Sequence, residues 1–526
     1  MFSRKRAAYI AAAALTTALG VGVLAAGMAG GTNEPMGSLT DDPSYVKTTA
    51  AGWSVKPLLT AGEDVPRLGG KTGKEMYRFT GIPDGIGAYP LGGVMSVLVN
   101  HEFGKAIVTR PNIKPDGTAE GDITGSYVSQ LLVDRQSGGV IGGKLAFDDI
   151  YQGSTRLGAT GDPKFAFTRF CAGSIAGPAQ GFDRHIYFAG EESSGADTFD
   201  GKGGMAVAIF DGHAYVLPQL GRFAHENVVV LPGTGDATVI LGLEDGPSSL
   251  DSQLYMYVGK KDRTSADALA RNGLTGGDLY VYRSTTANKT SEANFHLGDG
   301  VINGEWAKLT GATTMNETEL EAAADAANAF TFLRIEDGSP DPANMGTFYF
   351  VTTGTSPKDA DGKYINATGR LYRMVIDPAN PTAGGKLEVL IESDKEPDAR
   401  KVTNPDNIEV GPQGMIIIQE DATAEGSLEM TRMGRDGSIW AYNIKTKGLE
   451  RIAEIDQIVT GEAAAMGNWE TSGVFDVSKY MGKWSWLIVV QAHSLNSLKA
   501  SQQQDFSEDV KLGEGGQLLL LTKGRG

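Results

Sequence analysis

The sequence has 526 residues, of which 71 are glycine, and its formal net charge is −17. This acidic balance disfavours nucleic acid and anionic membranes as partners, and it suits a protein that holds several divalent or trivalent cations. Frequent glycine among scattered Val, Ile, Tyr and Phe indicates many short strands and tight turns, and the length is ample for one large core or two ordinary ones.

Residues 1–31 are predicted to be an export signal peptide. Met1–Arg6 is basic, Ala7–Ala26 is apolar and uncharged, and Ala29–Gly31 offers small residues for cleavage. The apolar stretch is also long enough for an uncleaved membrane anchor, but its Ala/Gly-rich, Leu-poor composition favours a signal. Ser3–Arg6 is a loose version of a twin-arginine motif, which fits export of an already folded metalloprotein. We therefore expect an exported protein (periplasmic, cell-surface or secreted) with no membrane span after cleavage.

Residues 32–76 read as a Gly/Thr/Pro-rich linker or lead-in, and residues 77–526 as one domain of repeated strand pairs. In each pair an apolar strand ends in polar or acidic residues and a second strand follows after a loop. The pairs are Val94–Glu102 with Tyr127–Arg135, His185–Glu192 with Met205–Phe210, Thr238–Asp245 with Gln253–Val258 (extended by Gly277–Arg283), Gly346–Thr353 with Gly369–Ile376, Gly414–Asp421 with Gly437–Ile444, and Trp484–His493 with Gly516–Thr522.

Six such units predict an all-β fold, a six-bladed β-propeller with inserted loops and short helices. The helices are expected near Ser265–Arg271 and Glu317–Ala329, where Ala, Leu and Glu recur without Gly or Pro. A large β-sandwich has similar hairpins, but it would not explain the repeated acidic strand end.

A polar cluster precedes the first predicted strand of each pair. Equivalent positions of successive blades lie on a ring around the central channel of a propeller, so we expect the acidic and thiol groups of these clusters to meet at one face. They are Cys171, Glu226, Glu336, Asp406 and Glu470, and the strand ends add Glu102, Glu192, Asp245 and Asp421.

This combination of side chains points to bound cations. Carboxylates cannot crowd together in ionised form without positive charge, because like charges at a few ångströms raise the pKa values or push the site apart. Carboxylates with carbonyl groups suit calcium, whereas one thiolate among carboxylates suits a redox-capable ion such as iron. The alternative for Cys171, the only cysteine of the chain, is a small buried hydrophobic residue.

In their order, these motifs resemble those of the PhoX-type alkaline phosphatases, from about Tyr77 to Thr522. Three departures bear on substrate shape more than on metal binding: a longer spacing from Cys171 to Glu192 that lacks the expected tryptophans, Ile335 in place of a proline, and Ala492 within a Gln-His pair. The matching motifs are Asp84-Gly85, Val99–Glu102, Arg169–Gly173 with Gly190–Glu192, Gly221–Glu226 with Glu244-Asp245, Arg334–Glu336, Asn404–Asn407, and Glu470–Gly473 with Gln491–His493.

The resemblance implies an exported, metal-dependent phosphomonoester hydrolase that releases inorganic phosphate. It implies two irons that share the thiolate of Cys171, three calcium ions and a bridging oxo group, and Arg334 as the residue that clamps phosphate oxygens. An ordinary ion pair of Arg334 with Glu336 or Asp337 is the alternative. By resemblance the iron ligands are Cys171, Glu192, Glu226 and Asp406, with Glu336 and Glu470 next, and Glu102 and Asp245 are further metal ligands.

His101 and His225 are expected to orient a carboxylate rather than to bind metal. Two other functions stay open: a calcium-dependent propeller hydrolase of the lactonase or phytase-like type, which would not need Cys171 and predicts no iron, and a non-enzymatic propeller that binds a partner or carbohydrate at the cell surface. For the phosphatase we expect a monomer whose partners are small phosphorylated substrates.

Overall fold

The computed structural model describes residues 37, 39–246, 251–358, 364–412, 414–422, 428–456, 469–493 and 511–524. The predicted signal peptide lies outside the described residues. Within those residues no helix has the length and the apolar composition that a membrane crossing requires.

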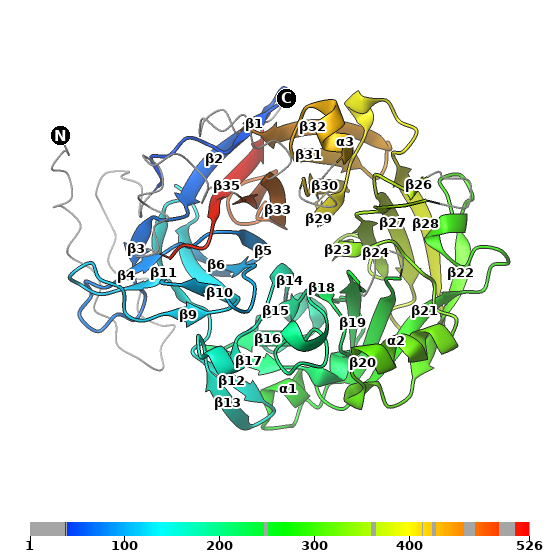
Figure 1. Cartoon of the computed structure of the whole chain (residues 1–526), viewed down its shortest axis with the longest axis horizontal. Helices are drawn as coiled ribbons and strands as arrows, with labels where there is room; N and C mark the ends of the chain where they lie inside the picture. The colour runs from blue at the N-terminus through cyan, green and yellow to red at the C-terminus, as the bar shows by residue number, and fades with distance from the viewer. Residues whose placement is uncertain are drawn as a thin grey trace.

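Five large sheets surround a common axis, as in a β-propeller (Figure 1), and all their strand pairs are antiparallel except β12 with β17. Each begins near the axis with a short inner strand and continues outward through hairpin neighbours. The first sheet contains β5 (Pro83–Leu91), β6 (Val94–His101), β10 (Tyr127–Asp134) and β11 (Val140–Leu145). The second contains β14 (Phe170–Ala176), β15 (Ile186–Glu191), β16 (Ala206–Phe210), β17 (His213–Val216), β12 (Asp149–Gln152) and β13 (Thr155–Ala159).

The third sheet is a continuous nine-stranded one with an inner strand at each end. Its strands are β18 (His225–Val230), β19 (Ala237–Glu244), β20 (Leu254–Lys260), β21 (Asp278–Ser284), β22 (Ile302–Leu309), β28 (Gly385–Glu392), β27 (Arg370–Ile376), β24 (Thr347–Thr352) and β23 (Ile335–Pro340).

The last two sheets include strands from both ends of the described chain. One contains β29 (Pro405–Gly411), β30 (Met415–Glu420), β31 (Ser438–Asn443), β32 (Gly448–Ile455) and β1 (Val46–Thr48). The other contains β33 (Trp469–Asp476), β34 (Ser485–Ala492), β35 (Gly515–Lys523) and β2 (Trp53–Thr60). Small accessory sheets are formed by β3 (Asp64–Pro66), β4 (Met76–Arg78) and β8 (Asn112–Ile113), by β7 (Val108–Thr109) and β9 (Ile123–Thr124), and by β25 (Thr355–Lys358) and β26 (Tyr364–Asn366).

All six predicted strand pairs are present as antiparallel neighbours: β6 with β10, β15 with β16, β19 with β20, β24 with β27, β30 with β31, and β34 with β35. The inner strands β5, β14, β18, β23, β29 and β33 contact one another in this order, and β33 contacts β5, which closes the ring. The expected all-β propeller architecture is therefore confirmed. Its count of six separate blades stays a prediction, because edge pairing of β22 with β28 joins two of the strand series in one sheet.

The segment predicted as a lead-in to the propeller is part of the sheets. β2 pairs with β35 from Trp53 opposite Lys523 to Thr60 opposite Gln517, and β1 pairs with β32. The Gly- and Thr-rich composition of this segment hid two strands whose partners lie at the far end of the chain. The sheet formed by the C-terminal strands therefore receives its outer strand from the N-terminal part.

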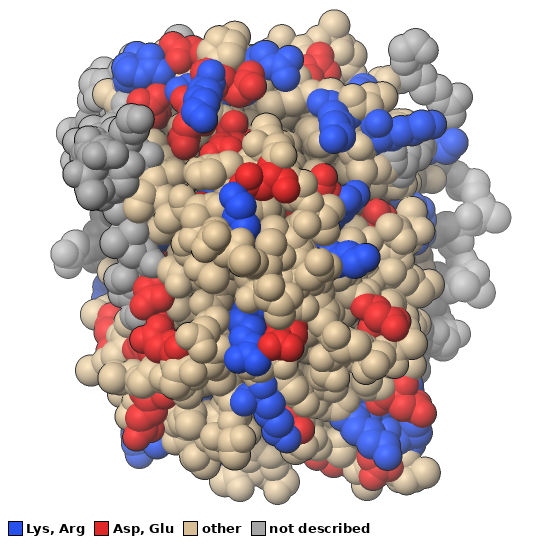
Figure 2. Space-filling view, turned by 90° about the vertical axis from the view of Figure 1, so that its right-hand side faces the viewer, with Lys and Arg blue, Asp and Glu red and all other residues tan. Residues whose placement is uncertain are grey.

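The predicted helices are present in shortened form as α1 (Ala268–Arg271) and α2 (Glu317–Ala326), with a third, α3 (Leu428–Met433). Helix α2 begins with a capping box in which Asn316 accepts from the Glu319 amide at 3.0 Å and the Glu319 carboxylate accepts from the Asn316 amide at 3.0 Å. On the outer side seen in Figure 2, Lys and Arg are interspersed with Asp and Glu, so the net negative charge does not form a single patch there.

Candidate metal centre

The polar clusters predicted to precede the first strand of each sheet are themselves the start of the inner strands. Cys171 is the second residue of β14, Glu226 of β18, Glu336 of β23, Asp406 of β29 and Glu470 of β33. Asp84 takes the same place in β5. Each inner strand carries polar residues near its start, and bulges interrupt the side-chain alternation in all six, which is why sequence periodicity did not reveal them.

A β-bulge lies at the candidate ligand in five of these six strands. In β14 the pairing runs from Phe170 opposite Glu191 to Gly173 opposite Ala189, so Cys171 and Ala172 bulge out of the ladder. The bulged residues of the other strands are Asp84-Gly85, Glu226, Glu336-Asp337 and Asp406-Asn407. Because a bulge bends the strand and re-aims the extra side chain, it can turn these groups from the sheet face toward the axis.

A second repeated feature ties each inner strand to the end of its neighbour. The carbonyl two residues before the candidate ligand accepts a hydrogen bond from the amide of the residue that follows the second strand, over 2.9–3.1 Å. The pairs of acceptor and donor are Ile82 with Glu102, Arg169 with Glu192, Ala224 with Asp245, Arg334 with Thr353, and Asn404 with Asp421. The two predicted rings of acidic residues are thus fixed to each other by the backbone.

Buried carboxylates hold the loops that lead into the inner strands. Glu191 accepts from the Thr168 amide at 3.0 Å and Glu420 from the Thr403 amide at 2.7 Å. Both amides lie three residues before a candidate ligand. Fully buried Glu191 also accepts from the amides of Phe199 and Met205. Their hydrogen bonds satisfy backbone groups that would otherwise be buried without partners.

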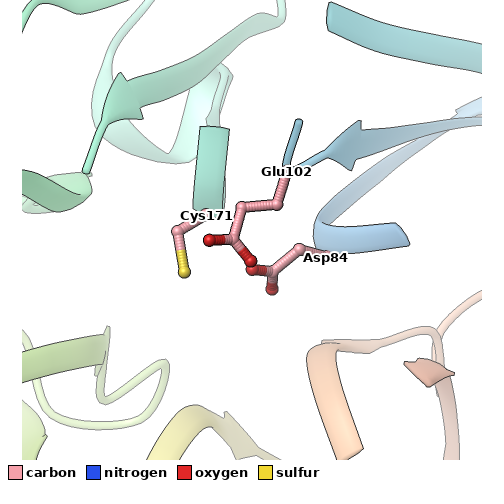
Figure 3. Close-up of side chains that lie close together, drawn as sticks. All are labelled: Asp84, Glu102 and Cys171. Carbon is pink, nitrogen blue, oxygen red and sulfur yellow. The ribbon is translucent and has the colours of Figure 1, made fainter. Parts of the chain in front are cut away.

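The candidate ligands form three groups that share members and so make one chain of donor atoms. Within each group the ligand atoms lie within 4.8 Å of one another. Figure 3 shows the first, in which the carboxylates of Asp84 and Glu102 point toward each other and the sulfur of Cys171 points into the same space. The groups are Asp84, Glu102 and Cys171; Cys171, Glu226 and Asp406; and Asp406, Asp421 and Glu470.

The electrostatics of the groups call for added positive charge. Burial, and after it the carboxylates of Glu336 and Asp406, raise the pKa of Glu226 well above its ordinary value. Burial and the nearby Glu102 carboxylate raise the pKa of Asp84 to about 7. The pKa of the Cys171 thiol is raised by burial and then by Asp84. Without added positive charge, burial and mutual repulsion therefore favour the protonated forms of these groups.

Unpartnered oxygens support the same conclusion. Both carboxylate oxygens of Glu226 and Oδ1 of Asp406 are buried and have no hydrogen-bond partner among the described residues. A buried polar atom of this kind is costly unless something binds it. Oxygen donors of carboxylates fit calcium, and a thiolate beside them fits iron. The residues present therefore fit a cluster of cations.

Arg334 and three acidic residues predicted as ligands lie beside these groups in ion pairs. Nε and Nη2 of Arg334 donate to the two Asp245 oxygens at 2.9 and 2.8 Å, and Nη2 lies 3.4 Å from Glu336. Nε and Nη2 of Arg169 both donate to Oε2 of Glu192. None of Glu192, Glu336 and Asp245 belongs to the three ligand groups, whereas Glu102, which also pairs with Arg169, belongs to the first.

The partner of Arg334 differs in part from the predicted ion pair. Glu336 is near the guanidinium, as predicted, but the bidentate partner is Asp245. Asp337 turns the other way, where it accepts from the Asn227 side chain and from the Ile408 amide. The bulge explains this, since Glu336 and its neighbour Asp337 leave the ladder on opposite sides.

Neither histidine orients a carboxylate, contrary to the prediction. Nδ1 of His101 donates to the Gly81 carbonyl at 2.9 Å and Nε2 accepts from the Ser129 hydroxyl at 2.7 Å. His225 Nε2 donates to the Gly221 carbonyl at 3.3 Å. Burial lowers the pKa of His101 to about 4 and that of His225 to about 3. Both rings are neutral parts of the packing between sheets.

The sequence did not lead us to name Asp84 or Arg169 in the site, and Asp421 was expected at the same face but was not named as a ligand. Asp84 accepts from the Ser472 hydroxyl and from Gln491 Nε2 at 3.2 Å, so it joins the first sheet to the last. Its place in Pro83-Asp84 matches that of Asp406 in Pro405-Asp406, a signal that could have identified it. Arg169 could have been found from its spacing to Cys171, which equals that of Arg334 to Glu336.

Comparisons with solved structures agree with the fold. PhoX of Pseudomonas fluorescens in complex with vanadate superposes with a TM-score of 0.63 and 15% identity, over 93% of this chain and 98% of that one. An α-L-arabinofuranosidase, Arb93A, of Fusarium graminearum (8% identity, 89% and 98% covered) and an α-L-arabinanase of Penicillium chrysogenum (10% identity, 85% and 98% covered) both give a TM-score of 0.38, which is too low to carry an argument.

No match was found among curated protein sequences. The family model described as alkaline phosphatase PhoX matches residues 213–505, more than half of the 526-residue chain. The matched segment includes four of the inner strands, from β18 to β33, with Glu226, Glu336, Asp406 and Glu470. The chain therefore belongs to the PhoX alkaline phosphatase family.

Proposed function

We propose that the protein hydrolyses phosphomonoesters over the inner ends of its sheets and releases inorganic phosphate. Family membership makes it a metal-dependent phosphoester hydrolase. The observation that supports the location is the chain of three ligand groups, with the buried, unpartnered oxygens of Glu226 and Asp406. The departures at Ile335 and Ala492 change the surroundings of this centre and leave its ligand-type residues in place.

We assign iron to the thiolate by donor type and the carboxylates by their resemblance to the family motifs. Cys171 with Glu226, Asp406 and Glu192, and next Glu336 and Glu470, would hold iron, and Glu102 and Asp245, together with Asp84 and Asp421, would hold calcium. When bound, such cations neutralise phosphate oxygens and the negative charge that develops in the transition state. This acidic chain supplies little positive charge of its own at the centre, apart from the arginines beside it.

Arg334 binds the phosphoryl group in this proposal. Asp245 holds its guanidinium through Nε and Nη2, so the plane of the group is fixed before substrate arrives. A planar fork of fixed orientation matches phosphate oxygens better than a flexible ammonium does. Preorganised donors of this kind stabilise the charge of the transition state without further rearrangement.

The test is hydrolysis of p-nitrophenyl phosphate at alkaline pH with calcium present, together with elemental analysis of the native protein. We expect turnover, and iron with an excess of calcium. Turnover with calcium and no iron would favour the single-calcium hydrolase. The absence of turnover in protein that carries iron and calcium would reject the phosphatase proposal and leave the non-enzymatic binding protein.

We also propose a monomer that is exported by the twin-arginine route. Members of the PhoX family are exported, and folding around cations before export fits a route that carries folded proteins. Light scattering of the purified protein would measure its mass. Replacement of Arg4 and Arg6 by Gln would leave the protein in the cytoplasm if the route is correct.

A further inference from the structure

Arg169 lies at β14 in the position that Arg334 has at β23. Each arginine precedes the candidate ligand of its strand by two residues, Cys171 in one case and Glu336 in the other. Both have left-handed backbone conformations, with φ of 42° and 61°. Both carbonyls accept the strand-end hydrogen bond described above. The left-handed conformation is uncommon for a residue with a long side chain, so its repetition fixes two arginines in equivalent positions.

The two guanidinium groups are also held alike. Nη2 of Arg169 lies 2.9 Å from Glu102, and Nε donates to Glu192 at 3.2 Å. Glu102 follows β6, which comes before the inner strand β14 of Arg169. Asp245, the partner of Arg334, follows β19, which comes before the inner strand β23. The two acidic residues are therefore in equivalent positions. In both arginines Nε and Nη2 are engaged, and Nη1 makes no hydrogen bond to a described residue. Each therefore keeps one amino group with two donors for a ligand.

Both arginines face the same part of the centre. The strand between them is β18, which carries Glu226 with its two unpartnered oxygens. Glu192 pairs with Arg169, and its charge also acts on Arg334, together with Asp245 and Glu336. The Arg169 side chain is 47% exposed and that of Arg334 is 19% exposed, so Arg169 is the more accessible from solution.

We propose that Arg169 is a second phosphate-binding residue, which holds the phosphoryl group from the side opposite Arg334. This inference rests on the proposed function and adds a residue to it. A phosphomonoester dianion presents three non-bridging oxygens. A single arginine amino group and the residues beside it cannot bind all three. Two guanidinium groups with free Nη1 donors on both sides of one site would select the phosphomonoester over a diester, which has only two such oxygens.

The experiment compares Arg169→Gln and Arg169→Lys with the wild type in the metal-loaded, full-length protein. The probe is inorganic phosphate, whose inhibition constant is measured against p-nitrophenyl phosphate, and iron and calcium are counted in each sample. For Arg169→Gln we expect the inhibition constant of phosphate and the KM to rise by about 10- to 100-fold, because one hydrogen bond to a charged group is lost. The metal content should not change. Arg169→Lys keeps a positive charge beside Glu102 and Glu192, so its inhibition constant and KM should lie between those of the wild type and of Arg169→Gln.

Selectivity gives a readout that a merely structural role would not move. The ratio of kcat/KM for p-nitrophenyl phosphate to that for bis(p-nitrophenyl) phosphate should fall in Arg169→Gln. Arg156→Gln is the matched control, because Arg156 is similarly exposed at 52% and is paired with Asp149 on the outer strands β12 and β13. It should change neither the ratio nor phosphate inhibition.

Three results would overturn the proposal. One is wild-type phosphate inhibition and selectivity in Arg169→Gln at full metal content. Another is a loss of activity that follows a loss of metal in both Arg169 variants, since Arg169 would then only position Glu102 and Glu192. The third is a metal-loaded wild type that neither turns over p-nitrophenyl phosphate nor binds phosphate, which would reject the proposed function as well. The metal count and the wild-type assay distinguish these cases.

Discussion

Cys171 is buried among oxygen atoms and not among methyl groups. Its sulfur lies within 4.8 Å of ligand atoms of Asp84 and Glu102 on one side and of Glu226 and Asp406 on the other. A structural cysteine packs as a small apolar residue, and these neighbours would make a poor apolar pocket. Cys171 is as buried as a packing cysteine would be, with 6% of its surface exposed. Its polar neighbours nevertheless make the role as a metal ligand the better prediction.

Replacement of Cys171 by serine should remove iron and phosphatase activity while the fold and much of the calcium remain. The hydroxyl has nearly the same size, but it is a poor ligand for a site adapted to a thiolate. Elemental analysis, activity and the circular dichroism spectrum of the purified variant would measure the three effects. Full iron content with full activity in Cys171→Ser would return the cysteine to a packing role.

Replacement of Arg334 by alanine should cost about 2–4 kcal/mol of transition-state stabilisation, the range for a preorganised charge-stabilising donor. Arg334→Lys should recover only part of this stabilisation, because Asp245 cannot fix the orientation of a flexible ammonium as it fixes the planar guanidinium. Values of kcat/KM for p-nitrophenyl phosphate, with iron and calcium counted, would show this at unchanged metal content. Arg373→Ala is the control, since Arg373 pairs with Glu388 on the outer strands β27 and β28. Wild-type rates in Arg334→Ala would contradict the role of Arg334.

At the scale of the element, the bulges of the inner strands need close approach between neighbouring strands. Gly85 lies in the bulge of β5 against the bulge of β14. A Cβ atom at this position would lie 2.2 Å from the Gly173 nitrogen and 2.6 Å from the Cys171 carbonyl oxygen. These are backbone atoms, which cannot move aside as the end of a flexible side chain can. Glycine is therefore required here for packing, independently of its backbone freedom.

The substitution Gly85→Ala should push β5 and β14 apart and lower the free energy of unfolding by about 1–3 kcal/mol, as overpacking does. Because the displaced backbone carries Asp84 and Cys171, the metal content should fall as well. Denaturant unfolding and elemental analysis would measure both. Gly93→Ala is the control, since nothing lies within 4 Å of a Cβ atom there. If Gly85→Ala matched that control in stability and metal content, the close approach would have no such role.

Sequence patterns predicted some elements well and missed others for a physical reason. The second and third strands of the sheets are buried on both faces and read as apolar runs, such as Ile416–Ile418 in β30, so their pairs were correctly predicted. The inner strands combine glycines, bulges and polar side chains, and their sequences resemble turns. Most of the candidate ligands were nevertheless named from the sequence, because a polar cluster with an acidic or thiol group recurs before the apolar strand of each pair.

Other features of the site depend on contacts that no sequence pattern encodes. The partner of Arg334 is Asp245, 89 positions away, and the preference over Asp337 follows from the bulge of β23. The neutral packing of His101 depends on Ser129, in the adjacent strand of its sheet. The strand character of residues 53–60 depends on a partner strand at the other end of the chain.

For the whole molecule, buried carboxyl groups make stability depend on pH. Burial, and then the nearby Asp476, raise the pKa of Glu409 to about 8. Glu409 lies outside the ligand groups; it accepts from Ser339 Oγ at 2.8 Å and from the Asp476 amide at 3.3 Å. Because its folded pKa is raised, its contribution to stability is fully present below its unfolded value of about 4.5 and is lost as pH rises through about 8.

In the presence of a chelator, Tm should therefore fall between about pH 5 and pH 8. Glu409→Gln replaces the neutral carboxyl by an amide and should make the decrease of Tm with pH less steep. Glu450→Gln, at an exposed position, should leave this pH dependence unchanged. Differential scanning calorimetry across this range would measure the slopes. An equal slope in Glu409→Gln and the wild type would show that Glu409 is ionised in both states.

The pairing of β2 with β35 also has a consequence in time. The Tyr45 amide donates to the side chain of Gln517, 472 positions later, so the earliest strands cannot find their partners until nearly all of the chain has been synthesised. Until then the nascent protein is an open arc with exposed sheet edges, a form that is prone to aggregate. The candidate metal ligands are made in the same order: Asp84 is made early, whereas Glu470 and the Ser472 and Gln491 partners of Asp84 come last. Closure of the ring and assembly of the candidate ligand groups are thus late steps of one maturation event, and residues from early and late parts of the chain meet in them.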